Sequence, residues 1–134
     1  MVQKLTKQND FPLHLGAFKP TGHVVVTLED DGAAQAFAAA LNGEGIGADD
    51  VLVFTGAEMA ARLRPLVDEA SGAAGFGSEI QAMRAYLKLA DEGAGSVIVY
   101  APEEQVQQRV GALAGRHKAL QARMYNRLTV EELV

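Results

Sequence analysis

The stretch SGAAGFGSEI, residues 71–80, comes closer to a ligand-binding motif than any other part of the sequence. Its three glycines precede a predicted helix, and free N–H groups at a helix start can bind a phosphate or a carboxylate. The motif does not follow a strand, as a dinucleotide fingerprint does, and no lysine follows Gly77, as a P-loop requires. The simpler interpretation is structural: Gly72 ends one helix, and Ser78 and Gln81 form a capping box for the next.

If this turn does bind a ligand, the ligand is an anion or a nucleotide. The candidate ligand-binding residues are Ser71, Gly75, Gly77 and Ser78 of the turn, with Arg84 and Tyr86 on the following helix. The protein would then be a small-molecule sensor or a minor enzyme, with its site between a sheet and a helical insertion.

Other residues that could do chemistry show no catalytic or metal-binding spacing. His14, His23 and His117 are far apart, so no two histidines share a helix face as a zinc site requires. Adjacent acidic pairs fall near predicted helix ends or loops, where neighbouring side chains point apart. No serine lies in a Gly-x-Ser-x-Gly elbow, and the chain has no cysteine. We therefore expect no catalytic residue, no metal and no cofactor.

One basic cluster near the C-terminus could contact nucleic acid. It contains Arg123, Tyr125 and Arg127 on one side of a predicted strand, after Arg116 and Lys118. Exposed aromatic side chains on a sheet can stack on RNA bases. The net charge of −5 and the pI of about 5.1 oppose nucleic-acid binding, so this stays the weaker hypothesis. The alternative is that this face is solvated or contacts another subunit.

The apolar patterning predicts four strands and the helices between them. Strands are expected at residues 23–28, 50–56, 96–100 and 120–128, the last half-exposed. Helices are expected after Asp30 or Asp31 and from Pro102. Two further helical segments, 57–70 and 78–91, lie between the second and third strands, and Pro65 should break or kink the first of them. Thr129 and Glu132 predict a capping box for a final helical turn.

This order, β-α-β, a helical insertion and β-α-β, predicts an α+β fold of ferredoxin-like type with helices on one face of a four-stranded sheet. The alternative is a small doubly wound α/β sheet in which the inserted helices form a crossover. We expect one domain over residues 1–134. It divides into an N-terminal arm (1–21), a first β-α-β unit (22–56), a helical insertion (57–95) and a second β-α-β half (96–134).

The composition is that of a soluble globular protein, with 49% hydrophobic and 22% charged residues. No apolar run approaches the length of a membrane span, so no membrane partner is expected. The N-terminus lacks the apolar region of a secretory signal, and the absence of cysteine fits a reducing compartment. We therefore expect a cytoplasmic protein.

Two segments carry a resemblance to a known family. They are TGHVVVTLEDDGAAQAFAAALNGEGIGADDVLVFTG, residues 21–56, and GSVIVYAPEEQVQQRVGALAGRHKALQARMYNRLTVEEL, residues 95–133. Their repeated order of strand, acidic turn, alanine-rich helix and strand resembles the small bacterial general stress (heat-induced stress) proteins. The insertion is helical where that family often has a glycine-rich apolar linker. The resemblance implies the fold, and it carries over no catalytic residue.

These observations together favour a non-enzymatic cytoplasmic bacterial protein of stress-response or regulatory type. A half-exposed last strand and a loosely patterned arm are edges that can pair with a second copy. We therefore expect a homo-oligomer, with a dimer as the first expectation.

Overall fold

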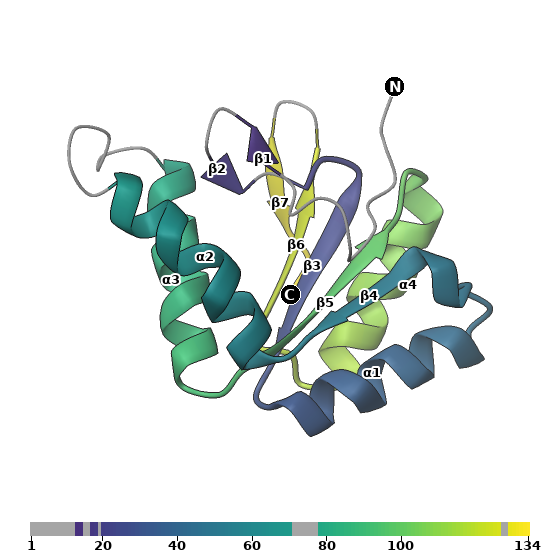
Figure 1. Ribbon diagram of the computed structural model, residues 1–134. Helices are drawn as coiled ribbons and strands as arrows, with labels where there is room; N and C mark the ends of the chain where they lie inside the picture. Colours follow the sequence, from purple (N-terminus) through teal and green to yellow (C-terminus); the bar gives the residue numbers. More distant parts are fainter. Residues whose placement is uncertain (1–12, 15–16, 19, 71–77, 127–128) are drawn as a thin grey trace.

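The computed structural model describes residues 13–14, 17–18, 20–70, 78–126 and 129–134 (Figure 1). In chain order the elements are β1 (Leu13–His14), β2 (Ala17–Phe18), β3 (His23–Leu28), α1 (Asp31–Gly43), the 3₁₀-helix η1 (Ala48–Asp50), β4 (Val51–Phe54), α2 (Gly56–Ala70), α3 (Ser78–Asp91), β5 (Gly95–Tyr100), α4 (Glu104–Arg116), β6 (Gln121–Tyr125) and β7 (Val130–Glu132). The predicted α+β class is confirmed. Among the described residues, no helix is long and apolar enough to cross a bilayer.

The main sheet has five strands in the order β4-β5-β3-β6-β7, and every neighbouring pair is antiparallel. The doubly wound parallel alternative is therefore wrong. All four predicted strands are present, and each β-α-β unit is split by one strand of the other unit. Strand β5 lies between β3 and β4, and β3 lies between β5 and β6. Strands β1 and β2, in the predicted arm, pair in a separate two-stranded sheet.

Helices α1 and α4 cover one face of this sheet (Figure 1). Alternate side chains of β3 and β5 point to this face and meet the apolar stripes of both helices, as period-two strands and amphipathic helices should. Helix α1 begins after the N-cap Asp30, whose carboxylate accepts a hydrogen bond of 2.7 Å from the Ala33 N–H. The main buried residues are Val24, Val26, Leu28, Phe37, Leu41, Val97, Val99, Val110, Leu113 and Met124.

Helices α2 and α3 pair with each other and cover the opposite face, so the prediction of helices on one face is wrong (Figure 1). They bury a second core against Val25, Phe54 and Ile98, whose side chains point to this face of the sheet. The helical spacing of the apolar residues in α2 and α3 is visible in the sequence, but the sheet face against which the two helices pack is not. The helix residues in this core are Met59, Leu63, Val67, Met83, Tyr86, Leu87 and Ala90.

Pro65 does not break α2, which runs continuously from Gly56 to Ala70. Pro65 and Ala61 are both exposed. Because the proline ring and missing N–H affect the carbonyl four residues earlier, the lost bond falls on the solvent side, where water can replace it. The buried side of α2, with Leu63 and Val67, keeps its packing. Tertiary contacts thus override a local helix breaker.

The C-terminal segment is a strand and not the predicted helical turn. Thr129 belongs to the turn between β6 and β7, where its carbonyl accepts a 2.8 Å hydrogen bond from the Asn126 N–H. Glu132 pairs with Arg123 across the two strands. The capping-box pattern predicted helix here, but the exposed edge of β6 offers backbone hydrogen bonds that a short helix would lack.

Candidate functional site

His23 and two of the three tyrosines lie on the sheet face that α2 and α3 cover. Tyr100 on β5 is the cross-strand partner of His23 on β3, and their ring centroids are 5.1 Å apart. Tyr125 lies on the neighbouring strand β6, and the backbone carbonyl of Tyr125 accepts a 2.7 Å hydrogen bond from the Gly22 N–H. Tyr86 reaches the same region from α3. Polar aromatic side chains from four elements therefore meet at one end of the sheet.

Tyr86, Arg123, Tyr125 and Glu132 form what we call the tyrosine–arginine cluster. The hydroxyl oxygens of Tyr86 and Tyr125 are 2.8 Å apart, and the two residues are only 2% and 4% exposed. The Arg123 guanidinium carbon lies 5.5 Å from the centroid of the Tyr86 ring. Arg123 Nε donates a 2.7 Å hydrogen bond to Glu132 Oε1. The cluster joins α3, β6 and β7.

Burial determines the protonation states of Tyr86, Tyr125 and His23 at neutral pH. Burial raises the pKa of the Tyr86 hydroxyl well above its usual range, and it raises the pKa of Tyr125 as well. Both hydroxyls are therefore protonated at neutral pH. Burial lowers the pKa of His23, whose Nδ1 lies 3.0 Å from the Thr21 carbonyl oxygen, so its ring is neutral.

Protonated hydroxyls beside a guanidinium are groups that bind a carboxylate. In this structure Glu132 of the same chain occupies that position at Arg123. The polar side chains of the cluster consequently contact one another within the chain, and these contacts hold the helix pair and β7 on the sheet. Because their raised pKa values keep both tyrosines protonated at neutral pH, they supply little phenolate to act as a nucleophile or a general base.

The residues predicted for an anion or nucleotide site are only partly described. Ser71, Gly75 and Gly77 lie outside the described residues, as does the side chain of Ser78, where α3 begins. Arg84 is exposed, whereas Tyr86 is buried in the tyrosine–arginine cluster. The structure therefore places these two predicted polar contacts on different sides of α3.

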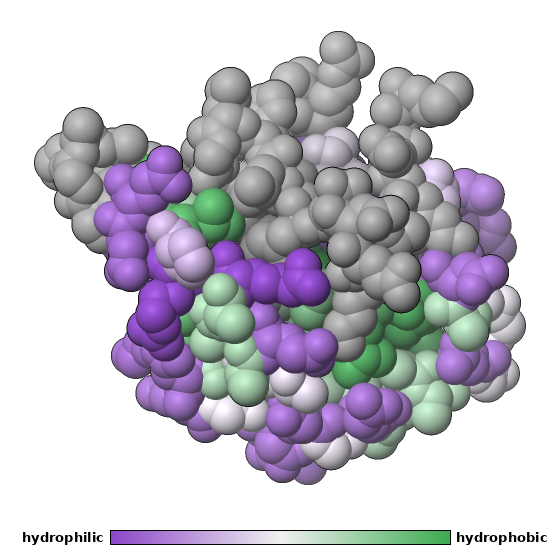
Figure 2. Space-filling model, viewed as in Figure 1, coloured by the Kyte–Doolittle hydropathy of each residue, from purple (hydrophilic) through white to green (hydrophobic). Residues whose placement is uncertain are grey.

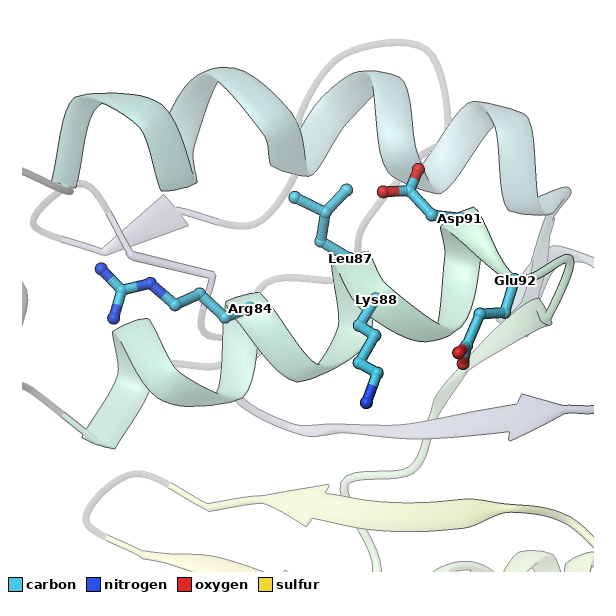
Figure 3. A pocket seen from close by; sticks show the side chains of 5 residues that line it. All are labelled: Arg84, Leu87, Lys88, Asp91 and Glu92. Carbon is cyan, nitrogen blue, oxygen red and sulfur yellow. The ribbon is translucent and has the colours of Figure 1, made fainter.

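Arg84 lines an open groove of about 340 Å³ along α3 (Figure 3). The lining residues belong to this helix except Glu92, which directly follows it. Figure 3 shows Asp91 directed toward α2, where Arg64 Nη2 lies 2.5 Å from Asp91 Oδ1. The groove thus carries two cationic side chains, Arg84 and Lys88, followed by two acidic ones, Asp91 and Glu92, a mixture that is ordinary on a solvated helix face. The lining residues are Arg84, Leu87, Lys88, Asp91 and Glu92.

Of the residues predicted for nucleic-acid binding, the two that the structure describes do not form an exposed stacking surface. Tyr125 is buried beneath α3, and Arg123 is paired with Glu132. Arg127 lies outside the described residues. Within β6 the predicted alternation is confirmed, since Ala122 and Met124 lie in one core and Tyr125 in the other, but α3 covers the face that was expected to be exposed.

Within the described ranges, no three histidine or acidic side chains are grouped as metal ligands. Helix α2 has a capping box that the sequence analysis missed: the Thr55 hydroxyl accepts from the Glu58 N–H at 3.0 Å, and Glu58 Oε1 accepts from the Thr55 N–H at 2.9 Å. The spacing Thr-x-x-Glu was its signal.

The two edges of the main sheet differ in chemistry. Strand β7 is short, exposed and carries Glu131 and Glu132. Strand β4, with the sequence VLVF, carries no charge, and no other described strand pairs with its outer side. Natural edge strands usually bear charges or prolines that prevent pairing with another chain, and β4 lacks both. Strand β4 is therefore the candidate interaction surface, in place of the predicted fourth strand, which is interior.

Comparison with known proteins identifies no relative. No protein-family model, no curated protein and no solved structure matches this chain.

Proposed function

We propose that this chain is a non-enzymatic, cytoplasmic bacterial protein of stress-response or regulatory type that self-associates. The observation that supports this proposal is the uncharged outer edge of β4. An apolar edge strand presents unpaired N–H and C=O groups, which another strand can satisfy. The tyrosine–arginine cluster adds support, because its side chains are engaged in contacts within the chain.

We also propose that the fold is a ferredoxin-like one, extended by β7 and by the α2–α3 pair. The split β-α-β arrangement supports this assignment, since a strand of the other unit separates the two strands of each unit. Such a fold, like the resemblance to general stress proteins, says little about biochemical activity.

Native mass spectrometry of the purified chain at low micromolar concentration tests self-association directly. The expected result is a dimer as the main species at neutral pH. A monomer at all concentrations up to about 100 μM, well above the Kd of a functional interface, would refute self-association.

A second candidate function is binding of a small anion between the sheet and the helical insertion. It is favoured by the carboxylate of Glu132, which shows that Arg123 can hold such a group. In the same spectra, a reproducible extra mass that disappears in Arg123→Gln but persists in the exposed control Arg116→Gln would support it. Spectra without extra mass after addition of millimolar acetate or phosphate would count against it.

A further inference from the structure

Helix α1 lies beside the β4 edge, and one contact shows which side of the helix faces that edge. Asp31 Oδ1 accepts a 2.9 Å hydrogen bond from the N–H of Gly56, two residues after β4 ends. Residues four, seven and eleven positions after Asp31 lie on the same side of a helix. These are Gln35, Ala38 and Asn42, which we call the α1 stripe; Gln35 and Asn42 are exposed, and Ala38 between them is buried.

The opposite side of α1 faces α4. There the ring centroid of Phe37 is 5.4 Å from that of His117, which follows α4. Arg109 of α4 also donates a hydrogen bond to the carbonyl oxygen of Glu44 at the end of α1. The α1 stripe is therefore directed away from α4, toward the side of the sheet where β4 is the edge strand.

The β4 edge and the α1 stripe together form an uncharged strip. Between Asp31 and Glu44, helix α1 contains no charged residue, and residues 51–57 contain none either. In Figure 2 green and pale atoms are mixed with purple ones over the region that β4 and α1 occupy in Figure 1, because uncharged glutamine and asparagine are also hydrophilic. Charged residues dominate ordinary solvated surfaces and are depleted at the centre of interfaces. The flanking acids, Asp49 and Asp50, precede β4.

We propose that a second copy of this chain pairs antiparallel with β4 across a two-fold axis at Leu52 or Val53, so that the two α1 stripes pack together. The inference rests on the proposed self-association and names its surface. Two-fold symmetry brings each residue close to its own copy near the axis, so a self-complementary surface must avoid charge there. Strand β7 does not meet this condition, because Glu131 and Glu132 would repel their copies.

The flanking acids fit this pairing. With the axis at Leu52, Asp50 lies opposite Phe54 of the second copy, and with the axis at Val53 it lies opposite Gly56 of the second copy. In both registers Asp49 and Asp50 face uncharged residues near the start of α2, where a helix N-terminus favours negative charge. A stable interface buries roughly 1,200–2,000 Å² in total. A four-residue strand cannot bury this area alone, which is why the α1 stripe belongs to the surface.

Disulfide trapping tests this arrangement, because the chain contains no cysteine. Single variants Leu52→Cys and Val53→Cys place one thiol at each candidate axis position, where cross-strand Cβ atoms come close enough to be bridged. The control Glu131→Cys places a thiol on the other edge strand. We expect mild oxidation to link at least one β4 variant into a covalent dimer much faster than the control. Linking of neither β4 variant above the control would overturn the proposal.

A charge variant provides a second, independent test. Gln35→Glu introduces a negative charge into the α1 stripe, and the matched control Gln105→Glu makes the same change on an exposed position of α4. We expect the dimer dissociation constant to rise roughly tenfold or more in Gln35→Glu, because like charges meet across the axis, and to stay unchanged in the control.

The outcomes separate the two proposals. A wild-type chain that stays monomeric overturns both self-association and this surface. A wild-type dimer whose dissociation constant is the same in Gln35→Glu and Gln105→Glu, and whose β4 cysteines do not link, overturns this surface alone.

Discussion

The hydroxyl oxygens of Tyr86 on α3 and Tyr125 on β6 lie 2.8 Å apart in a buried region. Because each buried hydroxyl satisfies the other, we expect Tyr86→Phe and Tyr125→Phe each to lower the free energy of unfolding by about 1–2 kcal/mol. The double variant should lose less stability than the two single variants added together, because neither hydroxyl is then left buried without a partner. Urea denaturation of the wild type, the two single variants and the double variant measures these free energies of unfolding. Strictly additive losses would contradict the coupling between the two hydroxyls.

The buried His23 should make stability depend on pH. Burial lowers its pKa below the usual value of 6.5, so the unfolded chain takes up a proton at a higher pH than the folded chain does. Stability from the neutral ring is therefore complete above pH 6.5 and is lost as the pH falls from there toward the folded pKa. We expect the free energy of unfolding to decrease over this window, and the decrease to shrink in His23→Gln but persist in His117→Gln.

Lys118 occupies a backbone position that favours glycine. Helices α1, α3 and α4 all end with a hydrogen bond from a residue to the carbonyl five positions earlier, namely Ile46 to Leu41, Ala94 to Leu89 and Ala119 to Ala114. The left-handed residue in this motif is Gly45, Gly93 or Lys118, the last with φ of 56°.

Thermal and urea unfolding can measure the cost of this lysine. We expect Lys118→Gly to raise the free energy of unfolding by about 0.5–1 kcal/mol, because a side chain is strained in this conformation. The reciprocal change Gly45→Ala should lower it by about 1 kcal/mol. A destabilised Lys118→Gly variant would show that the lysine makes a contact worth more than the strain.

Gly95 allows β5 to approach the start of α1 closely. A Cβ atom at this position would lie 2.8 Å from the Ala34 Cβ and 3.0 Å from the Asp30 carbonyl oxygen. We therefore expect Gly95→Ala to lower the free energy of unfolding by about 1–3 kcal/mol. Gly47→Ala is the control, because that glycine has an ordinary φ of −63° and open space around it. Equal effects of the two substitutions would refute the steric argument.

The buried hydroxyl of Thr27 has no hydrogen-bond partner among the described residues, although Thr27 is only 2% exposed. An unsatisfied hydroxyl in a core is unfavourable relative to a methyl group of the same shape. We expect Thr27→Val to raise the free energy of unfolding by about 1 kcal/mol. A clear loss of stability in this variant would mean that the hydroxyl is hydrogen-bonded in solution.

Local patterns predicted the elements of this fold well. The β-branched runs around Val25 and Ile98 became central strands, and Asp30 caps α1, because these preferences depend on residues only a few positions apart. The prediction failed where contacts with residues far away in the sequence decide the local structure. Pro65 remains inside a helix and Thr129 lies in a hairpin, since packing and backbone pairing outweigh a local breaker or cap.

The functional hypotheses divide in the same way. The sequence alone determined the residue inventory: a cysteine-free, acidic chain with three tyrosines and an uncharged segment VLVF. Only the tertiary structure decided that Tyr125 is buried against Tyr86, that Arg123 is paired with Glu132, and that VLVF forms a sheet edge. The physical reason is that burial and strand order arise from contacts between residues far apart in the chain, which periodicity does not encode.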